Sequence, residues 1–278
     1  MVGNEYMNMT LVQASIANNG EAIIIVADRL LTSSFGTDFP DYESEGATPK
    51  IYLRENVAIG FAGSALYSDM AISEVSSTLT DFDKIVKKIS DFVKKQRETI
   101  INDEVLRITG IKSKDFFSDS PNVPEEVKGY IYGWRSNFSF NFQCIVAGYD
   151  KDKNGRISYI TDGGSMISVT NFGSGSIGSG SPFSEIYFDQ YNYDIAIPEI
   201  EGLFFAYKAK RWAEAPTGVG LKTDICILRK SSSPVKIGEE DKLMGEVRKA
   251  YNKEKEKISG IRGSLLKQLI KDSLGVLI

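Results

Sequence analysis

The sequence predicts an α+β domain in which two β-sheets are sandwiched between helical layers. The predicted elements follow the order strands, two helices, strands, two helices, strand, which differs from the βαβ alternation of a parallel sheet. The chain has 278 residues, of which 42% are hydrophobic, so it can bury one full core. We therefore expect one domain over residues 1–230, with insertions at about 33–48 and 103–139, and a charged amphipathic helical extension over 231–278.

Strands are indicated by short apolar runs that are rich in β-branched residues. Residues 10–17 (TLVQASIA) and 22–27 (AIIIVA) are two such runs separated by Asn-Asn-Gly, which is typical of a hairpin. The stretches KIYLRE and VAIGFAG indicate a second strand pair that ends at Gly63. Further strands are expected over 141–149, 156–161, 166–172 and 223–229.

Helices are indicated by apolar residues at helical spacing. Residues 82–102 carry Ile85, Val86, Ile89, Phe92 and Val93 on one stripe, which predicts a core-facing helix. Other helices are expected over 66–80, 182–193 and 199–213, and one or two surface helices over 237–272.

The absence of histidine limits the chemistry that this chain can perform. No histidine occurs in the sequence, which excludes Ser-His-Asp and Cys-His catalysis and histidine-ligated zinc. The two cysteines, Cys144 and Cys226, lie in separate apolar strand-like runs, so we expect buried free thiols, no thiolate metal site and no cofactor. An enzyme built on this chain must use carboxylates, lysine, hydroxyls or a terminal amine.

Charge and hydropathy point to no nucleic acid and no membrane as partner. Lys and Arg number 33 against 37 Asp and Glu, which gives a net charge of -4 and no basic footprint. No apolar run approaches the roughly 18 residues of a membrane span, and residues 1–10 lack the pattern of a signal peptide. From these features we expect a cytoplasmic protein.

Four motifs in order resemble the proteasome beta subunits and their bacterial relatives, which are N-terminal-nucleophile (Ntn) hydrolases. The motifs are TLVQASIANNGEAIIIVADR, KIYLRENVAIGFAGS, IGSGSPFSEIYFDQYN and EAPTGVGLKTDICIL. The resemblance covers roughly residues 10–100 and 140–230. It implies a four-layer αββα sandwich, a peptide or unfolded-protein substrate and a homo-oligomeric ring.

The resemblance also implies a set of catalytic residues. Thr10 matches the nucleophile, Asp28 the carboxylate after the second strand, and Lys50 the lysine that opens the third. Gly63 matches the turn whose N–H faces the developing oxyanion. Ser179 matches the serine that holds the terminal amine and its water.

Four further residues are carried over in the same way. Glu214 matches the acid that acts with the serine, at a position where the family usually has Asp, and Thr217 lies beside it. Phe61 and Ala65 flank the Ala62-Gly63 turn and are the expected substrate-binding side chains. The Phe61 ring should shorten the pocket for the residue before the cut bond and favour small residues there.

Three functions fit these residues. The first is a threonine peptidase or related amide hydrolase, whose nucleophile is exposed after loss of residues 1–9. The second is a catalytically inactive proteasome-like assembly subunit, favoured by Met9, which stands where the self-cleaving members usually carry Gly. The third is a transpeptidase or ligase, in which an amine rather than water resolves the acyl-enzyme.

Overall fold

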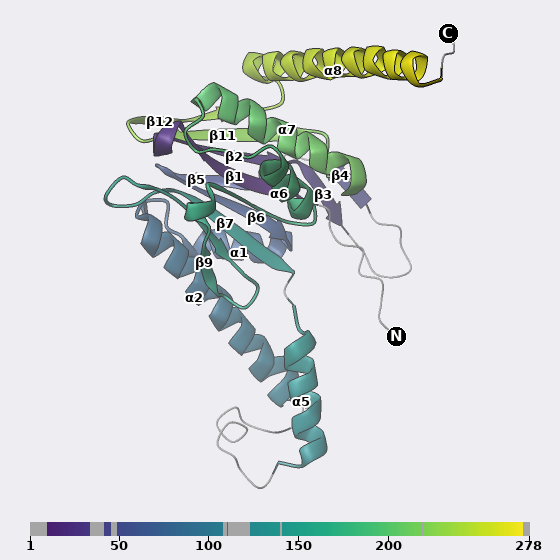
Figure 1. The fold of residues 1–278 in the computed structure, drawn as a ribbon. Helices are drawn as coiled ribbons and strands as arrows, with labels where there is room; N and C mark the ends of the chain where they lie inside the picture. The colour runs from purple at the N-terminus through teal and green to yellow at the C-terminus, as the bar shows by residue number, and fades with distance from the viewer. Residues whose placement is uncertain are drawn as a thin grey trace.

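Two five-stranded antiparallel sheets form the centre of the domain (Figure 1). The computed structural model describes residues 10–33, 42–45, 49–107, 110, 123–139, 141–217 and 219–274. The first sheet, in the order β10-β1-β2-β11-β12, comprises β1 (Val12–Ala17), β2 (Ala22–Asp28), β10 (Ser174–Ile177), β11 (Thr223–Arg229) and β12 (Ser232–Ile237). The second, in the order β5-β6-β7-β8-β9, comprises β5 (Ile51–Arg54), β6 (Val57–Gly63), β7 (Phe142–Tyr149), β8 (Gly155–Ile160) and β9 (Met166–Ser168).

Helices cover the outer face of each sheet. Helices α6 (Ser181–Gln190) and α7 (Glu199–Thr217) pack on the first sheet, and α1 (Ala65–Glu74) and α2 (Phe82–Ile100) pack on the second (Figure 1). The predicted α+β class and the four-layer αββα arrangement are therefore confirmed.

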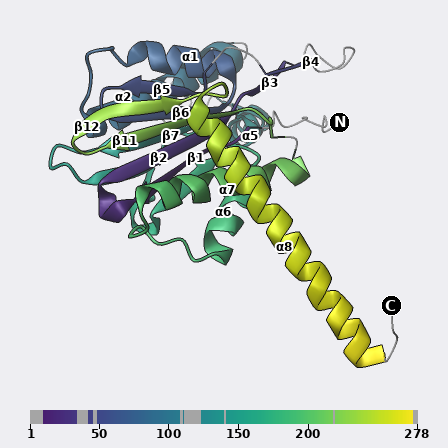
Figure 2. The ribbon, with the colours of Figure 1, turned by 90° about the horizontal axis from the view of Figure 1, so that it is seen from above.

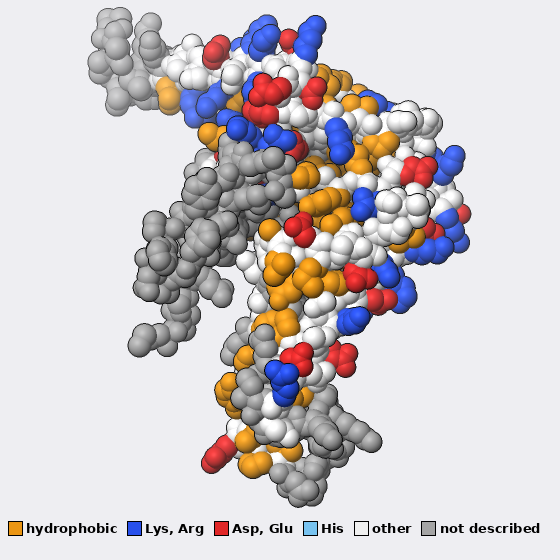
Figure 3. Space-filling model, turned by 180° about the vertical axis from the view of Figure 1, so that it is seen from behind, with side chains coloured by type: hydrophobic (Ala, Val, Ile, Leu, Met, Phe, Trp, Pro, Cys, Tyr) orange, Lys and Arg blue, Asp and Glu red, His pale blue; other side chains and the backbone are white. Residues whose placement is uncertain are grey.

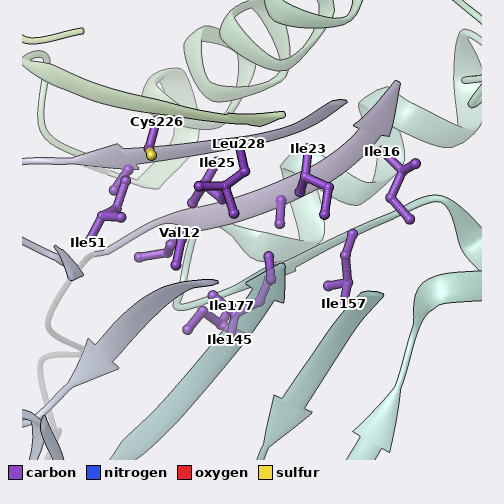
Figure 4. Packing of buried hydrophobic residues seen from close by; sticks show 14 of the residues in the cluster. Val12, Ile16, Ile23, Ile25, Ile51, Ile145, Ile157, Ile177, Cys226 and Leu228 are labelled. Carbon is purple, nitrogen blue, oxygen red and sulfur yellow. The ribbon is translucent and has the colours of Figure 1, made fainter. Parts of the chain in front are cut away.

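The two faces of β2 are buried in different layers. Ile23 and Ile25 belong to the core between the sheets, where Figure 4 shows them with Ile145 of the facing sheet. Ile24 and Val26 belong to the cluster under α6 and α7. Burial of one such side chain stabilises the fold by about 1.5–3 kcal/mol. Because both faces are covered, this strand reads as a continuous apolar run and not as an alternating one.

The hairpin predicted at the start of the domain is confirmed, and it places the candidate site. Strands β1 and β2 are joined by η1 (Asn18–Gly20), where all three residues have positive φ angles. The register pairs Val12 with Ala27, so the residues just before β1 lie beside the end of β2. Accordingly, the backbone N–H of Asp28 donates to the carbonyl of Leu11 at 3.1 Å.

The predicted helix over 82–102 is confirmed, with a small change of ending. The Asp81 side chain accepts a hydrogen bond from the N–H of Lys84 at 2.9 Å, which caps the N-terminus of α2. Ile85, Ile89 and Val93 face the second sheet. The chain then continues as a π-helix, η2 (Ile101–Leu106). Two other elements are shorter than expected, since α1 ends at Glu74 and the segment after β9 turns into η3 (Thr170–Phe172).

Both segments treated as insertions contain secondary structure. In the first, β3 (Leu30–Ser33) and β4 (Tyr42–Glu45) form a separate two-stranded ribbon, while residues 34–41 and 46–48 lie outside the described residues. In the second, α5 (Glu125–Asn137) packs against η2 through a small apolar cluster. Figure 1 shows α5 and the end of α2 as an arm that projects from the sandwich.

The segment after residue 230 is not helical throughout. It begins with β12, which pairs with β11 and completes the first sheet. Helix α8 (Lys242–Leu274) follows, and Figure 2 shows its second half extending beyond the body of the domain. Among the helices of the described residues, none combines the length and the apolar character that crossing a membrane requires.

Candidate active site

The Asp28 carboxylate accepts four hydrogen bonds from the described residues. Its Oδ1 accepts from the N–H of Leu11 at 2.8 Å and from Nζ of Lys50 at 2.8 Å. Its Oδ2 accepts from the N–H of Leu30 at 3.0 Å and from the N–H of Gly220 at 3.1 Å. The side chain is 0% exposed, so the oxygens depend on these donors instead of water.

The Lys50 ammonium lies between this carboxylate and the hydroxyl of Thr10. Besides its bond to Asp28, Nζ donates to Oγ1 of Thr10 at 2.8 Å. The Lys50 side chain is 6% exposed. Burial lowers the pKa of Lys50 below its ordinary value, and the negative charge of Asp28 partly opposes this by raising it. The arrangement thus places the positively charged Lys50 ammonium in direct contact with the Thr10 hydroxyl.

The backbone of Thr10 is held by the Gly/Ser-rich segment after β10. Its N–H donates to Oγ of Ser179 at 3.1 Å, and its carbonyl accepts from the N–H of Gly180 at 3.1 Å. At Gly178 φ is +93°, and a Cβ would lie only 2.2 Å from the Thr10 carbonyl oxygen. Only glycine allows this approach at 178, so Gly178 and Gly180 both hold the Thr10 backbone, and the sequence analysis did not single them out. The run GSGSPF at 178–183 is the sequence signal that could have identified these two glycines.

A small pocket of about 40 Å³ opens beside Thr10. Gly63 lines it with a φ of +95°, and a Cβ there would lie 1.8 Å from the carbonyl oxygen of Asn141. The residue must therefore be glycine. The other lining residues are Pro49, Lys50, Tyr52, Phe61, Ala62, Ala65, Ser68 and Asp69.

The two expected substrate-binding residues both line this pocket. Phe61 is 3% exposed, and its ring packs edge-on against Tyr52 with centroids 5.7 Å apart and against Phe142 at 5.7 Å. Ala65, the first residue of α1, is exposed at the mouth. Asp69 accepts a hydrogen bond from the Tyr52 hydroxyl at 3.2 Å and adds a carboxylate that the sequence analysis did not single out.

The remaining expected residues lie at the end of α7. The Glu214 carboxylate pairs with Lys210 and, at 2.7 Å, with Arg211. Among the described hydrogen bonds, none joins Glu214 to Thr10 or to Ser179, so its direct role at the amine stays a prediction. Thr217 ends α7, and its side chain lies outside the described residues.

The cysteines take no part in this arrangement. Cys144 and Cys226 are both free and buried, and burial raises the pKa of the Cys226 thiol to about 12. A thiol with so high a pKa is a poor nucleophile at neutral pH. Among the described residues, the Thr10 hydroxyl therefore lines a pocket and contacts a lysine whose other partner is the Asp28 carboxylate. This combination can activate the hydroxyl for attack on a carbonyl carbon.

The comparisons with known proteins bear on the fold. No family model and no curated protein matches the sequence. Among solved structures, Anbu (ancestral beta-subunit) from Yersinia bercovieri is similar, with a TM-score of 0.59 over 90% of this chain and 97% of that chain. The two sequences are 15% identical, so the likeness is one of fold. It agrees with the proteasome-like sandwich expected from the sequence motifs.

We expect Asp28→Asn to lower the pKa of Lys50 further below its ordinary value of 10.5. The negative charge of Asp28 is what opposes the effect of burial, and the substitution removes that charge while keeping the shape. Breaking this buried ion pair should also cost about 3–5 kcal/mol of unfolding free energy. Titration of labelled lysine side chains by NMR gives the pKa, and urea denaturation gives the stability.

The control for this titration is Lys208 on the same protein. Its ammonium bonds Glu254 at 2.8 Å, and its pKa should not respond to Asp28→Asn. An unchanged or raised Lys50 pKa in the variant would contradict the assignment of Asp28 as its charge partner.

Proposed function

We propose that this chain is a threonine peptidase of the proteasome beta type, with Thr10 as its nucleophile once residues 1–9 are lost. The observation that carries this proposal is the contact of Lys50 Nζ with both Thr10 Oγ1 and Asp28 Oδ1, each at 2.8 Å. A histidine-free chain can activate a threonine hydroxyl through the free α-amine of that same residue. The fold shared with a protein named as an ancestral beta-subunit supports the same function.

In the proposed first half-reaction, Oγ1 of Thr10 attacks the carbonyl carbon of a peptide bond. The hydroxyl proton passes to the free α-amine, directly or through a water held near Ser179, whose Oγ bonds the Thr10 nitrogen. The charged Lys50 disfavours protonation of that amine beforehand because the two cations would repel. Gly63 N–H stabilises the oxyanion, a role worth on the order of 3 kcal/mol in acyl-transfer enzymes.

The first half-reaction ends with departure of the leaving amine, and the second releases the acyl group. Collapse of the tetrahedral intermediate breaks the C–N bond, and the leaving amine takes the proton from the Thr10 ammonium. Water then attacks the resulting ester and gives up a proton to the Thr10 α-amine, and the ammonium so formed returns that proton to Oγ1 as the ester C–O bond breaks. The products are a carboxylic acid and a regenerated threonine hydroxyl.

A second candidate, an inactive assembly subunit, is favoured by one observation. Met9 precedes Thr10 in the sequence, so the Thr10 nitrogen is a peptide N–H and not an amine unless the preceding segment is removed. Two routes could free it: cleavage after Met9, or translation from Met9 followed by removal of that methionine. The peptidase requires the Thr10 nitrogen to be a free amine, whereas the assembly subunit does not.

Two proteins, one starting at Met1 and one at Met9, should separate these candidates. We expect the second to begin at Thr10 by intact mass, because aminopeptidases remove methionine before a small residue, and to hydrolyse short peptides. Thr10→Ala or Lys50→Ala should lower kcat by about 10³–10⁶-fold, the range seen when catalytic side chains are removed. A peptide boronate should inhibit by forming a tetrahedral adduct at the hydroxyl.

Peptide hydrolysis by protein that begins at Thr10 decides between these candidates. If a folded protein with Thr10 demonstrably at its N-terminus hydrolyses no peptide, the assembly subunit replaces it. If an added amine captures the acyl group in preference to water, the transpeptidase alternative applies. Thr78→Ala, a change at an exposed threonine that is not among the lining residues of the pocket, serves as the matched control and should leave turnover unchanged.

The small pocket predicts a preference for small residues before the cut bond. Its volume is about 40 Å³, and the Phe61 ring is the bulkiest apolar side chain in a lining that also includes Thr10. We expect peptides with Ala or Ser at this position to be cleaved with at least tenfold higher kcat/KM than those with Phe, a difference of about 1.4 kcal/mol. Phe61→Ala should reduce or reverse the ratio.

A fluorogenic panel measures this preference. Leu66→Ala is the control, because Leu66 is 65% exposed and does not line the pocket. Wild-type protein that cleaves best after Phe or Tyr would overturn the role assigned to Phe61.

We also expect this chain to assemble with copies of itself. Tyr130 and Tyr132 on α5 are more than half exposed, and so are Ile258, Ile261 and Leu265 on α8. Figure 3 shows apolar side chains along the arm that carries α5. Exposed apolar surface of this extent is typical of contact sites. Light scattering should give a multiple of 30.7 kDa, and a monomer at micromolar concentration would contradict the expectation.

A further inference from the structure

Helix α7 carries a lysine that is completely buried. Lys210 is 0% exposed and lies on the same stripe of the helix as Leu203, Ala206 and Ala213, all of which are buried. The spacing of these four positions is that of a core-facing helix surface. A lysine on such a stripe could have been noticed in the sequence, but its partners could not.

The Lys210 ammonium has one partner for each of its three hydrogens. It donates to the Glu214 carboxylate, to the carbonyl oxygen of Gly220 at 2.6 Å and to the carbonyl oxygen of Leu221 at 3.0 Å. Two of the three acceptors therefore belong to the short turn between α7 and β11. Glu214 supplies the compensating charge and is shared with Arg211.

The burial of this ion pair is not explained by stability. Burial lowers the pKa of Lys210, and Glu214 and, more weakly, Asp28 oppose this shift. Removing two charges from water costs several kcal/mol per ion, and apolar residues of similar volume usually replace such pairs without loss. A buried ammonium that binds two carbonyls of one turn instead fixes the position of that turn.

The same turn contacts the carboxylate of the candidate site. While its carbonyl accepts from Lys210, the N–H of Gly220 donates to Oδ2 of Asp28 at 3.1 Å. The turn has little room to move, because a Cβ on Gly220 would lie 2.6 Å from Cβ of Leu30 and 3.0 Å from Oδ2 of Asp28. A hydrogen-bonded path thus runs from Lys210 through Gly220 and Asp28 to Lys50.

We propose that Lys210, with Glu214 as its counter-ion, is a positioning residue that sets the 219–221 turn against Asp28 and so aligns Lys50 with Thr10. This inference rests on the proposed function for its effect on turnover. Under this proposal Glu214 acts on the site indirectly, because it holds Lys210 and Lys210 holds the turn. Lys210 itself touches neither the nucleophile nor the pocket.

The test is Lys210→Met, which keeps the length of the side chain and removes its three donors. Loss of the two carbonyl bonds should loosen the turn, so we expect the Gly220 amide to exchange with deuterium at least several-fold faster. In protein that begins at Thr10, kcat should fall by about 10–100-fold, the scale of a small misalignment. KM should stay within about twofold, because no substrate contact is lost.

Two further variants separate positioning from simple loss of structure. Lys208→Met removes an ion pair from the outer side of the same helix, where Lys208 bonds Glu254, and should leave kcat and Gly220 exchange unchanged. Lys210→Met combined with Glu214→Leu removes both charges of the buried pair and leaves Arg211, whose side chain is 29% exposed, to water, which should restore part of the stability that the single change costs. In this folded double variant, kcat should stay low and Gly220 should still exchange fast.

Two results bear directly on the proposed role of Lys210. Wild-type turnover and Gly220 exchange in the folded double variant would show that only the balance of charge mattered. If the wild-type protein with a free Thr10 hydrolyses no peptide, the proposed function fails. The exchange of Gly220 then still decides whether Lys210 holds the turn, since that measurement needs no activity.

Discussion

The candidate site depends on one buried carboxylate that collects donors from separate parts of the chain. Asp28 joins the N–H of Leu11 before β1, the N–H of Leu30 after β2, the N–H of Gly220 before β11 and the ammonium of Lys50 before β5. Each donor satisfies an oxygen that water does not reach. An ionised group in such a place is stable only when its hydrogen bonds are complete. The four segments must therefore meet, and the position of Lys50 relative to Thr10 follows from that meeting.

The layered core is what allows these segments to meet at fixed distances. Strand β2 is covered on one face by the other sheet and on the opposite face by α6 and α7. A shift of its register by one residue would exchange the two faces and carry Asp28 out of the site. Close approaches add a further constraint, since Gly178 and Gly220 each leave no space for a side chain beside Thr10 and Asp28. Packing and polar contacts thus specify the same geometry.

A chain without histidine places two buried lysines in different chemical surroundings. Burial lowers the pKa of both Lys50 and Lys210, and a carboxylate partly opposes the shift in each case. The groups that each ammonium contacts distinguish the two lysines. Lys50 contacts a side-chain hydroxyl, whereas two of the three groups that Lys210 contacts are main-chain carbonyls. The first arrangement suits activation of a nucleophile, and the second suits fixing a turn.

The sequence by itself determined the layers of the fold and some of the residues that meet around Thr10, among them Asp28, Lys50 and Ser179. Short β-branched apolar runs indicate buried strands and a period of 3.6 residues indicates the buried face of a helix, so strands, helices and the first hairpin could be predicted. The resemblance of four motifs to the proteasome beta subunits singled out Asp28 and Lys50. Only the tertiary structure decided that β12 completes a sheet, that α5 packs on the end of α2, and that Glu214 pairs with Lys210. These outcomes depend on contacts between segments far apart in the chain, and a local pattern encodes that a side chain is buried but not which group it meets.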